Sequence, residues 1–115
     1  SGFEAVTGSS YSDRLTGDDA DNVLEGGRGN DTLDGGLGDD TLYGDAGRDT
    51  FIFNTGENEF HGGDGEDRVL FENAASRYTI IDLSAGNWQI QDLVTTDMSL
   101  LFEIERLVFD EMVFI

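Results

Sequence analysis

The sequence predicts an all-β fold, a right-handed parallel β-solenoid with a C-terminal β cap. Three observations predict this fold. A nine-residue unit repeats without insertion from residue 8 to residue 70. The 115 residues include 16 glycines and no proline, and a closely stacked backbone needs glycine but cannot spare the amide donors that proline removes. Residues 71–115 lose the repeat and instead alternate apolar with polar residues, as ordinary strands do.

Seven units keep one register, and we number the places of each unit one to nine. The units begin at Gly8, Gly17, Gly26, Gly35, Gly44, Phe53 and Gly62. Place six always holds Asp or Asn: Asp13, Asn22, Asp31, Asp40, Asp49, Asn58 and Asp67. Place eight is always apolar: Leu15, Leu24, Leu33, Leu42, Phe51, Phe60 and Val69. Such a fixed phase over seven units indicates a repeat architecture.

Each unit combines a turn with a short strand. Its first half is rich in Gly, Asn and Asp, which tolerate positive φ angles, and its second half centres on one apolar residue. Two units, or 18 residues, then make one coil, and adjacent coils lie about 4.8 Å apart. We therefore expect Asp13, Asp31, Asp49 and Asp67 to stack along one edge, and Asn22, Asp40 and Asn58 along the opposite edge.

The composition restricts the class of partner. Twenty-five Asp and Glu stand against six Lys plus Arg, and the formal net charge of -19 argues against nucleic acids and anionic lipid surfaces. The sequence has no apolar run of 18 residues, so we expect no membrane insertion. It has no cysteine, so disulfides and zinc-thiolate sites are excluded. The natural partner is a cation.

The stacked acids indicate which cation. Neighbouring carboxylates at the spacing of a sheet repel by roughly 1 kcal/mol in water and by about 3 to 4 kcal/mol at an effective dielectric constant near 20. Calcium accepts about six to eight oxygen ligands and takes backbone carbonyls as readily as carboxylates. The turns therefore predict Ca²⁺ as the cofactor that holds the coils together.

The repeat resembles the nonapeptide of the repeats-in-toxin (RTX) family, Gly-Gly-x-Gly-x-Asp-x-apolar-x. The match is nearly letter for letter at 26–34, 35–43 and 62–70 and covers residues 8–70. The resemblance implies a calcium-binding β-roll. In that family each ion lies between two turns of one edge, bound by the carbonyls of places two and four and the Asp of one turn, and by the carbonyls of places one and three and the Asp of the next.

Carried onto this sequence, the resemblance implies five sites and about three to five bound ions. On one edge, the first two sites use Gly27, Gly29 and Asp31 with Gly44, Ala46 and Asp49, and Asp45, Gly47 and Asp49 with Gly62, Asp64 and Asp67. A third uses Ser9, Tyr11 and Asp13 with Gly26, Arg28 and Asp31, where Tyr11 replaces the usual glycine. The opposite edge offers Asp18, Ala20 and Asn22 with Gly35, Leu37 and Asp40, and Gly36, Gly38 and Asp40 with Phe53, Thr55 and Asn58. Those two sites have one column carboxylate each, so we expect weaker binding there.

Five ions would change the formal charge from -19 to -9, which couples folding to binding. The resemblance implies a module of a larger secreted bacterial protein that folds in extracellular calcium, with a type I secretion apparatus as a partner. Glu111–Ile115, an acid and four apolar residues, resembles the end of a type I secretion substrate, and a buried last strand is the other interpretation. An alternative function is a carbohydrate-binding or adhesive module, with glycans as partners.

We expect one domain with two parts. Residues 1–70 contain the repeats and an N-terminal strand at residues 2–6, and residues 71–115 form the cap, with strands around Tyr78 and Ile80, Trp88 and Ile90, 100–102 and 107–109. No catalytic site is expected. The sequence has no His-Glu-x-x-His motif, His61 is the only histidine, and the lack of lysine excludes a phosphate-binding loop. Any catalytic activity would lie in another part of the parent protein.

Overall fold

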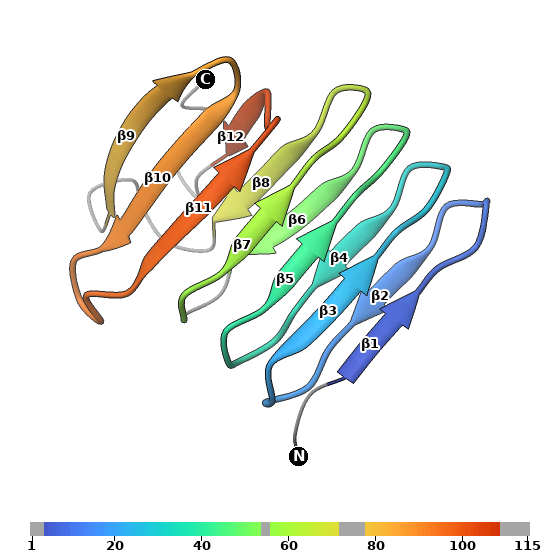
Figure 1. The fold of residues 1–115 in the computed structure, drawn as a ribbon, viewed down its shortest axis with the longest axis horizontal. Helices are drawn as coiled ribbons and strands as arrows, with labels where there is room; N and C mark the ends of the chain where they lie inside the picture. The colour runs from blue at the N-terminus through green and yellow to red at the C-terminus, as the bar shows by residue number, and fades with distance from the viewer. Residues whose placement is uncertain (1–3, 54–55, 72–77, 109–115) are drawn as a thin grey trace.

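The computed structural model describes residues 4–53, 56–71 and 78–108, and every regular element in these ranges is a β-strand (Figure 1). The strands are β1 (Glu4–Thr7), β2 (Arg14–Thr16), β3 (Asn22–Glu25), β4 (Thr32–Asp34), β5 (Thr41–Tyr43), β6 (Thr50–Phe53), β7 (Glu59–His61), β8 (Arg68–Phe71), β9 (Tyr78–Ser84), β10 (Asn87–Asp92), β11 (Met98–Phe102) and β12 (Arg106–Val108). Within these ranges no helix could cross a membrane.

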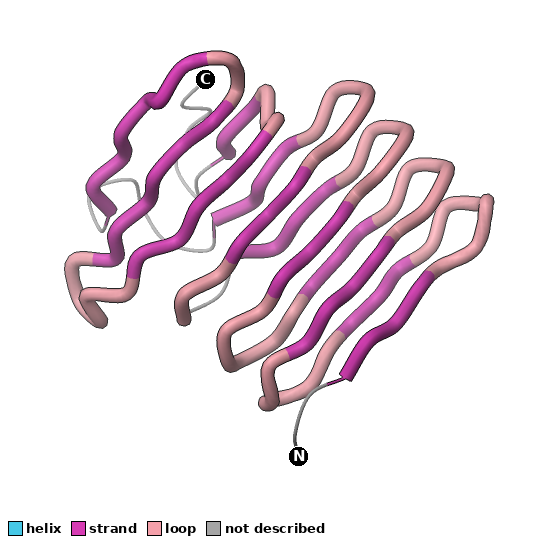
Figure 2. The backbone as a smooth tube through the Cα atoms, viewed as in Figure 1, coloured by secondary structure: helices cyan, strands magenta, loops and turns pink. Residues whose placement is uncertain are grey.

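The described strands form two facing sheets. One sheet has seven strands, ordered β1-β3-β5-β7-β11-β10-β9, and the other has five, ordered β12-β8-β6-β4-β2. The chain alternates between the two sheets from β1 to β9, whereas β10 and β11 stay in the larger sheet. Repeat strands two apart pair in parallel, for example Leu15 with Leu33 and Leu24 with Leu42. Figure 2 shows the turns gathered along the two edges between the sheets. The predicted solenoid, with two units per coil, is confirmed.

The core fills the space between the sheets. Strand residues alternate between the two faces of a sheet, so place eight of each unit points inward. The place-eight side chains from Leu24 to Val69 are at most 1 % exposed, whereas Leu15 in the first coil is partly buried. Full burial of each such side chain contributes about 1.5 to 3 kcal/mol relative to exposure.

The cap strands fall where the alternation predicted them, within the described residues. β9 and β10 form an antiparallel hairpin, and β10 pairs with β11. β11 and β12 then pair in parallel with β7 and β8, so the cap adds one more coil to the solenoid. β1 pairs in parallel with β3 as the predicted N-terminal strand. Residues 2, 3, 109 and Glu111–Ile115 lie outside the described residues.

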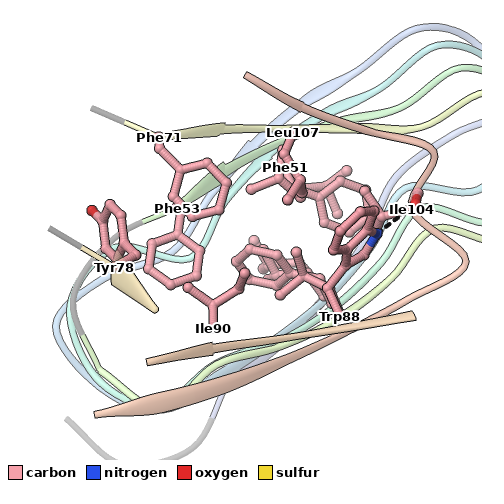
Figure 3. Close-up of a cluster of buried hydrophobic side chains, with 14 residues drawn as sticks. Phe51, Phe53, Phe71, Tyr78, Trp88, Ile90, Ile104 and Leu107 are labelled. Atoms are coloured by element: carbon pink, nitrogen blue, oxygen red, sulfur yellow. Dashed lines mark hydrogen bonds between the residues drawn. The ribbon is translucent and has the colours of Figure 1, made fainter. Parts of the chain in front are cut away.

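Aromatic side chains close the core on one edge near the cap. Phe53 and Phe71 occupy place one of successive turns on the Asn22 edge, where the earlier turns have glycine. Their ring centroids are 4.6 Å apart, and Tyr78 from β9 packs at 5.5 and 5.1 Å from them (Figure 3). β6 and β8 therefore continue into place one, and the hairpin is anchored to the core.

Candidate functional site

The place-six side chains form two hydrogen-bonded columns between the coils. On the edge of Asp13, Asp31, Asp49 and Asp67, which we call the acidic edge, one oxygen of each side chain from Asp31 onward accepts the N–H of the residue 18 positions earlier. The backbone N–H groups of Asp13, Asp31 and Asp49 donate at 2.7, 2.9 and 2.8 Å. On the opposite edge, which we call the amide edge, the N–H groups of Asn22 and Asp40 donate to Asp40 and Asn58 at 2.8 and 2.9 Å. Stacking thus uses one side-chain oxygen of every place-six residue from Asp31 onward.

The second oxygen of these carboxylates is buried without a hydrogen-bond partner. This holds for Oδ2 of Asp31, Asp40, Asp49 and Asp67, whose side chains are 1 or 2 % exposed. Leaving a buried polar atom unsatisfied costs about 1 to 3 kcal/mol, and more when the group is charged. The fold therefore provides oxygen atoms that need a cation or a proton.

The pKa values of these buried carboxyl groups are raised. Burial, opposed in part by hydrogen bonds and reinforced by neighbouring carboxylates, raises the pKa of Asp49 to about 8, that of Asp67 to about 7 and that of Asp40 to about 6. Burial also raises the pKa of Asp31. Without a bound cation, burial therefore shifts these groups toward the protonated form.

Backbone oxygens approach the same places. A Cβ atom at the place-one glycines Gly26, Gly44 and Gly62 would lie 2.5 or 2.6 Å from Oδ2 of the Asp in the same turn. The place-one carbonyl of the following coil approaches that position too, as the Gly26 oxygen does at 2.7 Å above Gly8. A repeat turn of the acidic edge therefore needs glycine at place one, because a side chain there would fill the space into which the oxygens project.

The carbonyls of places two and four face the next turn along the same edge. A Cβ atom at Gly27 would lie 2.7 Å from the Ser9 oxygen, one at Gly29 would lie 2.8 Å from the Tyr11 oxygen, and one at Gly63 would lie 2.6 Å from the Asp45 oxygen. Gly27, Gly29 and Gly63 have positive φ angles, which glycine adopts without strain. Since the place-one carbonyls point back toward the preceding coil, the two sets of oxygens project into the same gap between coils.

This donor set fits a hard divalent cation. All of its ligand atoms are oxygens. Among the described residues, no group of three or more His, Cys, Asp or Glu side chains could hold a metal ion by itself. A metal here must take most of its ligands from the backbone, and calcium does so readily. Asp31, Asp49 and Asp67 would hold it through their unpartnered oxygens, and a bound ion supplies the positive charge that these turns lack.

The acidic edge brings most of the predicted ligands together. Asp49 lies between the turns of Asp31 and Asp67, so the two sites predicted around Gly27–Asp49 and Asp45–Asp67 share its side chain. Ala46 and Asp64 are exposed at place three and could contribute only backbone carbonyls. Asp45 holds a positive φ of 67° at place two, a conformation that a glycine would adopt more easily.

The first turn of the acidic edge is arranged differently. The N–H and hydroxyl groups of Ser9 donate to the Asp13 carboxylate at 2.6 and 2.9 Å, so this carboxylate already has partners. Tyr11 is 78 % exposed and is not among the residues with positive φ, unlike the glycines at place four of later turns. Arg28, at place three of the next turn, is exposed.

On the amide edge, a side-chain amide occupies the gap between two turns. The Nδ2 atom of Asn22 lies 2.7 Å from the Ala20 oxygen, 3.4 Å from the oxygens of Asp18 and Gly35, and 3.3 Å from Oδ1 of Asp40. These are the atoms of the predicted ion site, and the amide already donates to them. Leu37, the remaining residue of that set, has a side chain 53 % exposed.

The second predicted site on the amide edge has an altered turn. Gly36, Gly38 and Asp40 keep the repeat geometry, and both glycines have positive φ angles. Phe53, however, stands at place one with its side chain in the core, and Thr55 lies outside the described residues. A carboxylate column with glycine at every place one is therefore found on the acidic edge only, in the part of the chain that the structure describes.

The structure adds two residues that sequence reasoning missed. Glu105 Oε1 accepts the N–H of Asp67 at 2.8 Å, and Ser99 Oγ accepts that of Asn58 at 2.9 Å, so each continues a column into the cap. The signal for Glu105 was present, because Glu105-Arg106-Leu107-Val108 repeats the pattern of Asp67-Arg68-Val69-Leu70. Its turn is shorter than a repeat turn, which takes it out of the nine-residue phase.

A groove of about 530 Å³ runs beside the acidic edge. Its lining alternates acidic groups with the arginines Arg48, Arg68 and Arg106 and with Thr32 and Thr50. Arg68 Nε donates to Thr50 Oγ1 at 3.0 Å. The groove is polar, and Asp31, Asp49 and Asp67 of the acidic edge are among its lining residues.

A family model described as the RTX calcium-binding nonapeptide repeat, in four copies, matches residues 1–33, 16–51 and 43–73, which is more than half of the chain. No curated protein matches the chain.

The raised carboxyl pKa values predict that acid stabilises the metal-free fold. Because the folded-state values lie above the ordinary 3.8, this stabilisation is fully present below 3.8 and is lost as the pH rises through about 6 to 8. In calcium-depleted buffer, β content by circular dichroism should therefore increase as the pH falls through that range. The double substitution Asp49→Asn and Asp67→Asn should reduce this dependence. A β signal that is independent of pH in the parent chain would contradict the prediction.

Proposed function

The chain belongs to the RTX calcium-binding nonapeptide repeat family, and on that premise we propose that it folds outside the cell as calcium binds and thereby assists the export of a larger secreted bacterial protein. It is a calcium-binding β-roll module with a structural role. Calcium-driven folding at the end of a secretion path is the part that we propose.

One observation carries the proposal: the acidic edge buries unpartnered carboxylate oxygens in successive turns. Burying an ionised carboxylate is costly unless it is paired or coordinates a metal. A calcium ion between two turns compensates both carboxylates and the carbonyls around them. The folded state therefore binds calcium much better than the unfolded chain, and binding stabilises it by linkage.

We propose that the best sites lie on the acidic edge. The first joins Gly27, Gly29 and Asp31 to Gly44, Ala46 and Asp49. The second joins Asp45, Gly47 and Asp49 to Gly62, Asp64 and Asp67. The glycines that approach the carboxylates and the shared position of Asp49 support both sites.

We propose that the remaining sites bind calcium more weakly. On the amide edge, the Asn22 amide already donates to the oxygens that an ion would need, and Phe53 replaces the place-one glycine of the second site. In the first turn of the acidic edge, Ser9 satisfies Asp13. An ion would have to displace these contacts before it could bind.

The charge of the chain supports a role in export. With a formal charge of -19, the metal-free polymer repels itself and stays expanded where calcium is scarce. Extracellular calcium modules bind at about 0.1 to 1 mM, so calcium outside the cell fills such sites. An unfolded chain can pass a narrow secretion channel, and folding on the far side opposes its return.

The polar groove beside the acidic edge favours a second candidate function, the binding of a glycan. Arg48, Arg68 and Arg106 could donate to sugar hydroxyls, and Thr32 and Thr50 add hydroxyl groups. A glycan array probed with the calcium-loaded chain tests this function. Retention of a glycan that is lost on the substitution Arg68→Ala would support it, and an array without binding would exclude it for the glycans displayed.

We predict that calcium folds the chain cooperatively and that Asp49 is central to the transition. Circular dichroism should show little β signal in EGTA and a steep rise with calcium. The substitution Asp49→Asn removes a carboxylate shared by two sites and should raise the calcium concentration at the midpoint by at least about tenfold, as loss of a metal-supporting group does. Asp64→Asn is the matched control, because it removes an equal charge from an exposed side chain and keeps the carbonyl. A strong β signal in EGTA would defeat the proposed function.

We predict that the substitution Asn22→Asp strengthens calcium binding on the amide edge. It replaces the amide donor by a carboxylate beside the oxygens of Ala20, Gly35 and Asp40. Isothermal titration calorimetry should show an additional or tighter bound ion. Asn30→Asp is the control, because Asn30 is exposed at place five and its Oδ1 accepts the N–H of Arg48, which an aspartate can also do. Equal binding by the two variants would contradict the prediction.

A further inference from the structure

The cap turn 103–105 imitates a repeat turn where the acidic edge ends. Phe102 O accepts the N–H of Gly62 at 2.8 Å, as Tyr43 O and His61 O accept those of Gly26 and Gly44. Glu103 therefore stands at place one of a last turn. Arg106 pairs with Arg68, so Glu105 stands at place six. Ile104 alone replaces places two to five.

Two oxygen atoms converge above Gly62. A Cβ atom there would lie 2.6 Å from Oδ2 of Asp67, and the carbonyl oxygen of Glu103 also lies against that position. Glu103 has a positive φ of 55°, a conformation seldom adopted by residues with a side chain. The same arrangement is found above Gly8, where the approaching carbonyl belongs to Gly26 of the next repeat turn.

An unpartnered buried oxygen points into this space. Asp67 is 1 % exposed, and its Oδ2 has no hydrogen-bond partner. Its Oδ1 accepts the N–H of Asp49 and its own N–H donates to Glu105 Oε1, so two carboxylates flank the gap between the last repeat turn and the cap turn.

We infer that this gap is a further calcium site, formed by the last repeat turn and the cap. Its ligands are the carboxylates of Asp67 and Glu105, the carbonyl of Glu103, and the carbonyls of Gly63 and Gly65, which by the repeat geometry face the cap. The site rests on the proposed function, because it uses the same ion and the same edge. It differs from the sites between repeat turns, because the cap supplies a glutamate in place of an aspartate. The longer side chain of Glu105 reaches the turn of Asp67 from a shortened turn.

The hairpin of the cap fixes the position of this turn. Gly86 O accepts the N–H of Ile104 at 2.8 Å, and Asn87 Oδ1 accepts that of Glu103 at 3.1 Å. Trp88 Nε1 donates to Ile104 O at 3.0 Å (Figure 3). Ile104 is fully buried under the hairpin. A bound ion would therefore link the solenoid to its cap through a rigid turn.

The opposite end of the last coil supports this assignment by contrast. There Ser99 continues the column with a hydroxyl group, which accepts the N–H of Asn58 and donates to Gly56 O at 3.3 Å. This hydroxyl group is neutral and both accepts and donates a hydrogen bond, so it offers no negative charge to a cation. The cap thus ends the acidic edge with a carboxylate and the amide edge with a satisfied hydroxyl group.

The test compares the substitutions Glu105→Gln and Glu66→Gln in the full chain. Both side chains are exposed and both changes remove one charge, but Glu66, which precedes Asp67 on the same edge, is no ligand of the proposed site. Calcium bound per chain is measured by equilibrium dialysis at saturation, with folding checked by circular dichroism. We expect Glu105→Gln to bind one ion fewer than Glu66→Gln and the parent chain while still folding with calcium.

Terbium provides a local readout, because Tb³⁺ takes the oxygen ligands of calcium and emits when a nearby indole is excited. Trp88 is the only tryptophan, and it contacts the cap turn. Indole-excited Tb³⁺ emission should be weaker in Glu105→Gln than in Glu66→Gln. Equal ion counts and equal emission in the two variants would overturn the terminal site while leaving the proposed function intact. A parent chain that binds no calcium would overturn both.

Discussion

The structure depends on how the place-six side chains are buried between coils. Each place-six side chain from Asp31 onward uses one oxygen to bind the N–H of the preceding coil, so the columns set the registry of the turns as the strands set that of the sheets. In the aspartates from Asp31 onward this leaves the second oxygen buried and without a partner. The contact that aligns the coils thus also creates the demand for positive charge.

The two edges meet this demand in different ways. On the amide edge the Asn22 side chain supplies hydrogen-bond donors where a cation would supply charge, and the aromatic rings of Phe53 and Phe71 close the core farther along. On the acidic edge, glycines at place one leave room for oxygens to converge. Among the described residues, the amide edge has one buried carboxylate with an unpartnered oxygen, Asp40, whereas the acidic edge has three, so we expect the calcium dependence of folding to come mainly from the acidic edge.

The cap ends the solenoid by adding a coil of different sequence. β11 and β12 continue the two sheets, and the β9–β10 hairpin covers the end of the core with Trp88 and Ile90. An uncovered last coil would expose strand edges and apolar side chains, which favours aggregation. Since the cap extends both columns through Glu105 and Ser99, it completes the hydrogen bonding of the last turns as well as the core.

The sequence by itself determined the solenoid, its 18-residue coil, the inward apolar column and the assignment of place-six residues to two edges, because a fixed period places equivalent residues at equivalent positions in every coil. It did not reveal that the Asn22 amide donates hydrogen bonds to the oxygens of a predicted ion site, since such hydrogen bonds depend on the distance between coils. Only the tertiary structure decided how the cap meets the repeats. Glu105 and Ser99 join the columns across separations of 38 and 41 residues, because a hairpin and a shortened turn interrupt the period. A repeat pattern carries no information about contacts outside its phase. Here the pairing of β8 with β12 places Glu105 at the position of a place-six residue, although it is out of phase in the sequence.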